Sequence, residues 1–179
     1  MALFSRSGPP GAEDIRRLYS MVAPILVRIA FRITGSSEAA EDVVQDAFAR
    51  LVEKEIPFPS MDDAKFWLIR VVKNGALNYA KRKGREAKAY EKWWHGEREQ
   101  ADSADESLLK NESADELRRG LEALPEKLKA VLVLKEYGGL NYKEIGRVLG
   151  ISEGNVKVRA FRAREALLGM LGEDSTNVS

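Results

Sequence analysis

Apolar residues recur at helical spacing through the first part of the chain. Between residues 13 and 34 the apolar positions fall three and four residues apart, at Leu18, Val22, Ile25, Leu26, Ile29 and Ile33. Such spacing places them on one face of an amphipathic helix. Gly35 is suited to end this helix, and Ser36 or Ser37 to cap a second one that carries Phe48 inward. Because no alternating strand pattern occurs in the sequence, we predict an all-α fold.

A proline-containing loop leads into a third predicted helix. Residues 56–59 read Ile-Pro-Phe-Pro, which interrupts helical structure. Ser60 then caps the third helix, with Asp63 at the capping-box position. Farther along, residues 97–112 are acidic and poor in large apolar side chains, so this segment cannot bury enough surface to fold by itself. We therefore predict a flexible acidic linker.

Capping and turn residues divide the second half of the chain into four short helices. The residues that favour helix starts are Ser113, Pro125, Asn141 and Ser152. The residues that favour helix ends are Gly138, Gly139, Gly150 and Gly172. Glu116 and Glu144 complete capping boxes at the first and third starts.

These patterns predict two small helical domains joined by the linker. The expected segments are an N-terminal tail at 1–12, a first domain at 13–95, the linker at 96–112, a second, four-helix domain at 113–172 and a C-terminal tail at 173–179.

Residues 141–168 have the glycine and valine spacing of a helix-turn-helix. Gly146 lets two helices cross closely, Gly150 supplies a positive-φ turn, and Val156 packs the second helix on the first. The N-terminal residues of such a second helix read base edges, and flanking cations hold phosphates, although a basic face can also be merely solvated. The candidate duplex contacts are Ser152, Asn155, Lys157, Arg159, Arg162 and Arg164. Arg159 is suited to bind guanine through two hydrogen bonds.

A second DNA-binding face is predicted on the third helix, where residues 70–85 include six basic residues and no acidic one. Amides can read bases and cations can hold phosphates. The candidate contacts are Asn74, Asn78, Lys81, Arg82 and Arg85, together with Phe58 from the preceding loop. Phe66 and Trp67 fit the core better than base stacking. Phe58, flanked by prolines, is less easily explained as core and is a candidate to hold an extruded base.

Composition excludes several classes of chemistry. The chain has 29 Lys and Arg against 28 Asp and Glu, and a single histidine. It has no cysteine, and this absence excludes disulfides, thiolate zinc sites and cysteine nucleophiles. No apolar run approaches the ~18 residues of a membrane span, and residues 1–11 lack the features of a signal peptide. We expect a cytoplasmic protein without membrane insertion, catalytic residues, metal or cofactor. Trp93, Trp94 and His95 receive no role.

Two blocks of the sequence resemble extracytoplasmic-function sigma factors. The segments at residues 41–48 (EDVVQDAF) and 66–74 (FWLIRVVKN) are similar to the second conserved region of that family. The segments at residues 124–126, 142–146 and 150–157 are similar to its fourth region. A helix-turn-helix alone is moderately specific, but both blocks in this order are highly specific.

The resemblance implies a non-enzymatic, alternative sigma factor that binds core RNA polymerase and promotes promoter melting. The β′ and β subunits of polymerase are then partners, and the residues implied to dock on the β′ coiled coil are Asp42, Gln45, Asp46 and Phe48. The third helix would capture the melted non-template strand of the minus-ten element, and the recognition helix would bind the minus-thirty-five duplex. An anti-sigma protein that clamps the two halves together is also implied.

The chain departs from the family pattern at three positions, where Val158 replaces a frequent serine, Ala160 a larger aliphatic residue and Asn78 a frequent aspartate. These departures leave the promoter sequence open. The sequence also does not reveal the inducing signal, the identity of the anti-sigma factor or the arrangement of the two domains.

Two other functions remain as alternatives. A transcriptional regulator that binds duplex DNA without polymerase would need a sensor or dimer surface in the first half. A nucleic-acid-modifying enzyme would use Glu38, Asp42 and Asp46 to bind metal, but no differently placed third carboxylate or phosphate-binding loop accompanies them.

Overall fold

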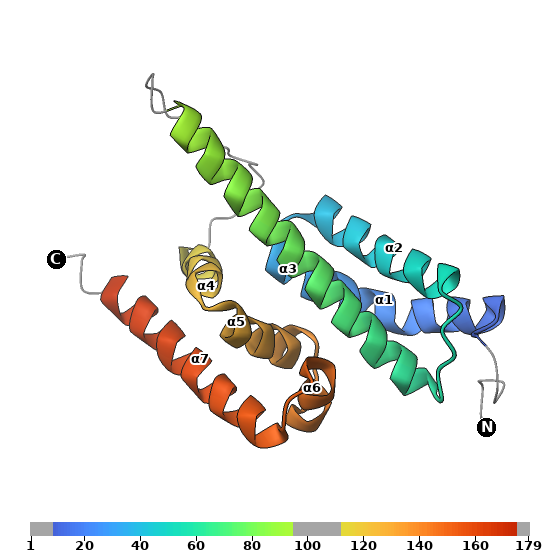
Figure 1. Ribbon diagram of the computed structural model, residues 1–179. Coiled ribbons are helices and arrows are strands. Elements are labelled where there is room, and N and C mark those ends of the chain that lie inside the picture. Colours follow the sequence, from blue (N-terminus) through green and yellow to red (C-terminus); the bar gives the residue numbers. More distant parts are fainter. Residues whose placement is uncertain (1–8, 95–111, 175–179) are drawn as a thin grey trace.

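A computed structural model describes residues 9–94 and 112–174 of the chain (Figure 1). The N-terminal half contains α1 (Ala12–Thr34), α2 (Ser37–Glu53) and α3 (Met61–Trp94). The C-terminal half contains α4 (Glu112–Ala123), α5 (Glu126–Leu132), the π-helical turn η1 (Val133–Tyr137), α6 (Tyr142–Leu149) and α7 (Glu153–Asp174). These ranges hold no strand, so the predicted all-α fold with two helical regions is confirmed. None of their helices is both long and apolar enough to cross a membrane.

The helix ends follow the capping and turn residues of the sequence. Gly35 and Gly150, each with φ of 69°, adopt the left-handed conformation that ends α1 and α6. The Ser36 hydroxyl accepts a hydrogen bond from the backbone of Ala39 at the start of α2. At the start of α6, Asn141 and Glu144 form a complete capping box, with hydrogen bonds of 2.8 and 2.9 Å.

Two elements differ from the predicted ones. The last helix runs through Gly172 to Asp174, because glycine costs a helix about 1 kcal/mol without forbidding it. The π-helical turn after α5 was not predicted from the sequence pattern. It depends on backbone hydrogen bonds from Gly138 to Val133 and from Leu140 to Leu134, which apolar spacing does not reveal.

The N-terminal half is a three-helix unit around a dense apolar core. Leu26, Ile29, Leu68 and Ile69 are fully buried, and burial of each such side chain contributes about 1.5–3 kcal/mol. A Cβ atom on Gly75 of α3 would lie 3.0 Å from a methyl group of Val43 on α2. The glycine therefore sets the close approach of these two helices.

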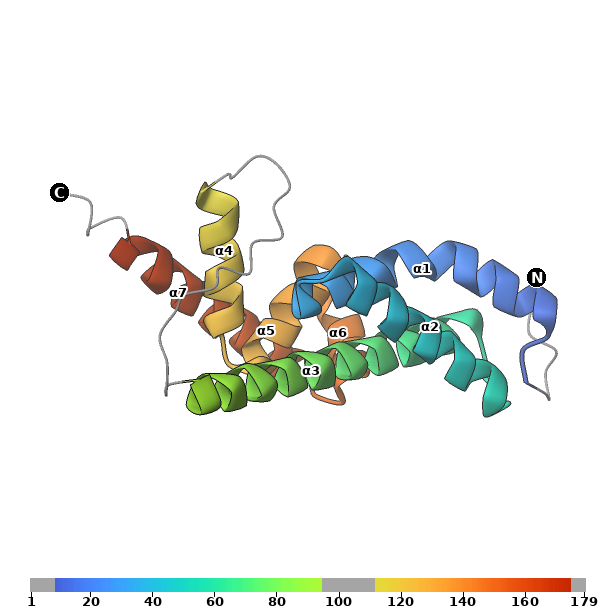
Figure 2. The ribbon, with the colours of Figure 1, turned by 90° about the horizontal axis from the view of Figure 1, so that it is seen from above.

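The two halves pack against each other and share one hydrophobic core. Val133, Leu134 and Leu140 of the C-terminal half belong to the same buried cluster as the core of α1–α3. The guanidinium of Arg32 on α1 stacks 4.3 Å from the ring centroid of Tyr137. Figures 1 and 2 show α6 and η1 facing α3 and α1, with α4 and α7 farther out. The sequence patterns had left this arrangement open.

Candidate nucleic-acid interfaces

The first interface is built on α6 and α7, which form a helix-turn-helix. A Cβ atom on Gly146 would lie 2.7 Å from the carbonyl oxygen of Ile151, a separation that real side chains do not show. Val156 is fully buried, in the same apolar cluster as Ile145. Only glycine at position 146 allows the two helices to meet in this way, so the predicted spacing is confirmed as steric packing.

The start of α7 is capped by Ser152. Its hydroxyl oxygen accepts a hydrogen bond of 3.3 Å from the backbone N–H of Asn155. The cap satisfies one of the backbone donors that begin every helix. It also leaves the side chain of Asn155 exposed in the first turn.

The predicted cations of α7 fall into different environments. Lys157 pairs with Glu153 at 2.8 Å; their hydrogen bond lowers the pKa of Glu153 and raises that of Lys157. Arg164 turns back toward η1 and α6 and lies 3.4 Å from the hydroxyl of Tyr142, which raises the Arg164 pKa. Arg162 is exposed and Arg159 is half-buried. Five of the six predicted residues thus lie on α7, which Ser152 caps, but they do not form one face.

Two exposed apolar side chains lie among these residues and were not predicted as part of the interface. Val158 is 47% exposed and Phe161 is 63% exposed. The sequence contained a signal for Val158, since positions 155, 158 and 162 are spaced i, i+3 and i+7 and share a helix face. The charge pattern had drawn attention to the cations instead.

The second interface is a groove of about 690 Å³ between α2 and α3. The α3 wall contains four of the predicted minus-ten residues, Asn74, Asn78, Arg82 and Arg85. The α2 wall contains three of the predicted polymerase contacts, Asp42, Gln45 and Asp46. The structure therefore brings together two sets of residues that the sequence assigned to different partners. Arg50 and Tyr79, which were not among the predicted residues, also line the groove.

Three predicted residues lie outside this groove. Phe58 is only 9% exposed and packs edge-on against Trp67, with ring centroids 5.8 Å apart. The interpretation of Phe58 as a side chain outside the core is therefore wrong, because its loop folds back over α3. Phe48 points inward as expected and packs on Tyr19; it is only 8% exposed, although the resemblance implied a polymerase contact for it. Lys81 pairs with Glu126 of α5 at 2.6 Å.

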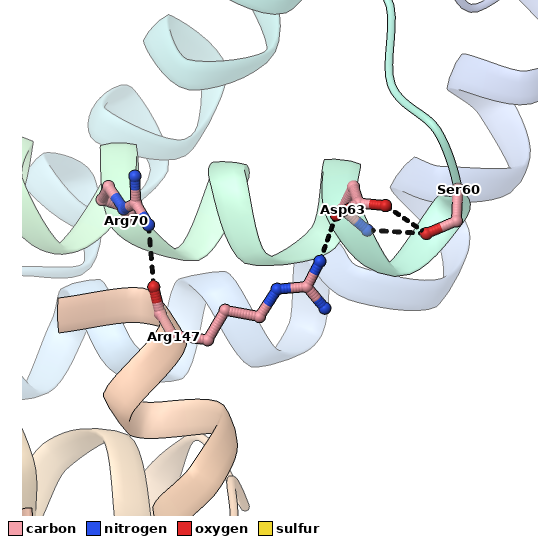
Figure 3. Close-up of polar contacts among 4 residues, drawn as sticks. All are labelled: Ser60, Asp63, Arg70 and Arg147. Atoms are coloured by element: carbon pink, nitrogen blue, oxygen red, sulfur yellow. Dashed lines mark hydrogen bonds and ion pairs between the residues drawn. The ribbon is translucent and has the colours of Figure 1, made fainter. Parts of the chain in front are cut away.

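Polar contacts fasten α6 of the C-terminal half to α3 of the N-terminal half (Figure 3). Arg70 donates hydrogen bonds to the carbonyl oxygens of Arg147, at 2.8 Å, and Val148, at 2.9 Å. Arg147 pairs with Asp63 and stacks 4.7 Å from the ring centroid of Phe66. The last carbonyls of a helix have no partner within the helix, so a guanidinium is well placed there.

Within the described ranges, no three His, Cys, Asp or Glu side chains gather into a group that would hold a metal ion. The side chains of Trp93 and Trp94, and residue His95, lie outside the part of the chain whose side chains are described. The same is true of Ser113 and Glu116, the predicted capping box of α4.

Comparison with known proteins assigns both halves of the chain to one family. Residues 18–86 match the family model of sigma-70 region 2, and residues 114–167 match that of sigma-70 region 4. The two matches define a protein of the sigma-70 class, with residues 153–167 of α7 in the region 4 match and the α2–α3 groove in the region 2 match.

Curated relatives narrow the class further. The ECF RNA polymerase sigma-E factor of Escherichia coli K12 is 32% identical over 136 residues, which cover 70% of each chain. The ECF RNA polymerase sigma factor SigE of Mycolicibacterium smegmatis is 30% identical over 182 residues, which cover 99% of this chain and 70% of the relative. The chain belongs to the extracytoplasmic-function family of sigma factors. It is an alternative sigma factor that binds RNA polymerase and recognises promoters to initiate transcription, as the resemblance implied.

Two solved structures share the fold at 22% sequence identity. The sigma factor RpoE from Bartonella quintana, solved with the anti-sigma factor NepR, gives a TM-score of 0.63 over 90% of this chain and 98% of its own. The protein CnrH, solved with the cytosolic domain of CnrY, gives a TM-score of 0.61 over 92% of this chain and 91% of its own.

Proposed function

We propose that this sigma factor contacts its promoter with two faces, α7 on the minus-thirty-five duplex and the α2–α3 groove on the melted minus-ten strand. The observation that carries the proposal is the groove, in which amide and guanidinium side chains of α3 line a space large enough to take up unpaired nucleic acid. No catalytic step is assigned to the chain itself, which acts with polymerase in the cytoplasm.

The α3 wall of the groove has the chemistry to hold a single strand. Asn74 and Asn78 present amides, which donate to and accept from base edges. Arg82 and Arg85 supply charge for phosphates, and the ring of Tyr79 is a surface for stacking. Bases held in this way stay out of the duplex, so strand capture stabilises melting without any catalytic group.

The α2 wall is proposed to dock on the β′ subunit of polymerase, with the β subunit as a further partner. Asp42 and Asp46 are exposed and spaced i, i+4, so they share one face of α2 beside Gln45. Their carboxylates stand across the groove from Arg82 and Arg85 and repel nucleic-acid phosphates. Covering them with polymerase removes this repulsion, which explains why the chain should bind promoter DNA with polymerase and weakly without it.

The closed packing of the two halves is proposed to be an inactive arrangement. Elements centred at minus ten and minus thirty-five are about 25 base pairs apart, or roughly 85 Å at 3.4 Å per base pair. A compact chain of this length has a radius of gyration of about 16 Å. The halves, proposed as domains 13–95 and 113–172, must therefore separate before both elements are bound together.

An anti-sigma factor is the proposed regulator of this separation. The two structural neighbours were solved in complexes, one with the anti-sigma factor NepR and one with the cytosolic domain of CnrY. A protein that binds the closed arrangement more tightly than the open one would shift the population away from polymerase.

Reconstituted transcription tests the proposed function. Core polymerase is supplied with a library of promoter DNA, with and without the chain. Promoter-specific transcripts that require the chain are expected. Specific duplex binding by the free chain, without association with core polymerase, would contradict the proposal.

A further inference from the structure

The outward face of α7 presents apolar side chains where polar ones are expected. The side chains of Val156, Ala160 and Ala163 are fully buried against the rest of the domain. On the opposite side of the helix, Val158 is 47% exposed and Phe161 is 63% exposed. Apolar side chains in water do not contribute the favourable free energy that they would contribute if a partner buried them.

Val158 lies at the centre of the proposed DNA-facing surface. Asn155, Val158 and Arg162 are spaced i, i+3 and i+7, so they form one stripe along α7. The stripe begins in the first turn of the helix, directly after the Ser152 cap. In a helix-turn-helix these first turns of the second helix enter the major groove.

The neighbours of Val158 favour DNA over a protein partner as the occupant. Val158 is bordered by the polar Asn155 and the cationic Lys157 and Arg162, and the exposed Phe161 follows one turn later. Cations along the helix match the phosphates on both sides of a major groove. The apolar group that the base edges present in that groove is the C5-methyl of thymine, and an exposed aliphatic side chain matches it.

We propose that Val158 is a specificity-determining residue that contacts the C5-methyl of a thymine in the minus-thirty-five element. The inference rests on the proposed function of α7. Burying one methyl group is worth about 0.8 kcal/mol, which corresponds to about a fourfold change in affinity. Asn155 and Arg162, on the same stripe, contact the flanking bases and phosphates.

The test uses the holoenzyme and thymines that lack the methyl group. A minus-thirty-five element is first selected from random duplex DNA with wild-type chain bound to core polymerase. Each thymine of the selected element is then replaced singly by deoxyuridine, which removes only the C5-methyl. One replacement should weaken wild-type holoenzyme binding about fourfold. The same replacement should have no effect on the Val158→Ala holoenzyme.

Leu168→Ala is the matched control. Leu168 is 67% exposed on α7 and lies ten residues beyond Val158, about 15 Å along the helix. Its holoenzyme should keep the full deoxyuridine effect. Circular dichroism of the Val158→Ala chain should match the wild type, because an exposed Val→Ala change in a helix does not disturb packing.

The contrary outcomes are distinct. A selected element without thymine, or wild-type binding that is indifferent to every deoxyuridine, overturns the role of Val158 and leaves the proposed function standing. An undiminished deoxyuridine effect in Val158→Ala does the same. Weakened assembly of Val158→Ala with core polymerase, without any deoxyuridine effect, assigns Val158 to a protein contact instead. Failure of the wild-type holoenzyme to select any element overturns the proposed function and this inference with it.

Discussion

Arg70 on α3 and Arg147 on α6 come from opposite halves of the chain, and the Arg70 guanidinium donates a 2.8 Å hydrogen bond to the Arg147 carbonyl oxygen. A second bond of 2.9 Å reaches the carbonyl of Val148. The side chain of Arg147 in turn pairs with Asp63, the third residue of α3 (Figure 3). One arginine of each half thus binds the other half.

Replacing Arg70 by alanine should loosen the packing of the two halves. The change removes two charge-assisted hydrogen bonds. Because the position is accessible to solvent, we expect the free energy of unfolding to fall by about 1 kcal/mol, less than for a buried hydrogen bond to a charged group. Energy transfer between labels on α2 and α7 should report a larger mean separation. Arg17→Ala, on the exposed face of α1, should change neither quantity. An unchanged label separation in Arg70→Ala would show that the apolar contacts alone hold the halves closed.

Gly146→Ala should destabilise the helix-turn-helix. The new Cβ would lie 2.7 Å from the backbone carbonyl of Ile151, so the turn must shift. We expect a loss of about 2 kcal/mol in thermal or denaturant unfolding, within the range of overpacked sites. Gly154→Ala is the control, because nothing lies within 4 Å of its Cβ position and alanine favours helix. A Gly146→Ala chain as stable as the wild type would mean that the close crossing is not needed.

Substitutions in the two walls of the α2–α3 groove should change the affinity for single-stranded DNA in opposite directions. Neutralising Asp46 to asparagine should raise the affinity of the free chain for single-stranded DNA, because it removes a carboxylate facing Arg82 and Arg85 across the groove. Arg82→Ala should lower that affinity. If Arg82 holds one phosphate, the slope of log affinity against log salt should fall by about 0.7.

Binding to core polymerase separates the two roles in the groove. Asp46→Asn should weaken assembly with core polymerase, whereas Arg82→Ala should leave assembly intact and reduce promoter melting, followed by permanganate reactivity of unpaired thymines. Equal effects of both variants on assembly and on melting would contradict the division of the groove into a polymerase wall and a DNA wall.

Lys73 should make stability depend on pH in the alkaline range. Burial lowers its pKa, opposed by the nearby Glu126 and reinforced by Arg70. The pKa of Lys73 is therefore lower in the folded chain than in the unfolded chain. At pH values between these two pKa values the unfolded chain binds more protons, so the free energy of unfolding rises with pH in that range.

Substitution by methionine isolates this effect. Lys73→Met should be more stable than the wild type at pH 7, where the wild type keeps a half-buried charge, and the difference should shrink as pH approaches the ordinary lysine pKa. Lys83→Met, at an exposed position of the same helix, should show no such trend in denaturant titrations. A constant difference across the pH range would exclude Lys73 as the cause.

Much of the local structure was predictable from the sequence because it depends on short-range chemistry. Gly35, Ser36, Asn141 and Gly150 lie at the helix ends predicted for them, since caps and left-handed turns involve residues only a few positions apart. The helix-turn-helix was predictable for the same reason.

What the sequence could not determine concerns contacts between distant segments. Phe58 was misassigned because a loop position does not say whether a ring packs back on Trp67. That Asp42 and Asp46 line the same groove as Arg82 and Arg85 depends on the approach of α2 to α3.

The sequence by itself thus determined most of the helices and their ends, apart from η1 and the end of α7, and which family of proteins they build. Only the tertiary structure decided that the two halves close on each other through Arg70 and Arg147 and that Val158 lies on the exposed side of α7. Periodicity assigns a residue to a face of its own helix. Which face is buried depends on residues far away in the chain, since the core forms where several such faces meet.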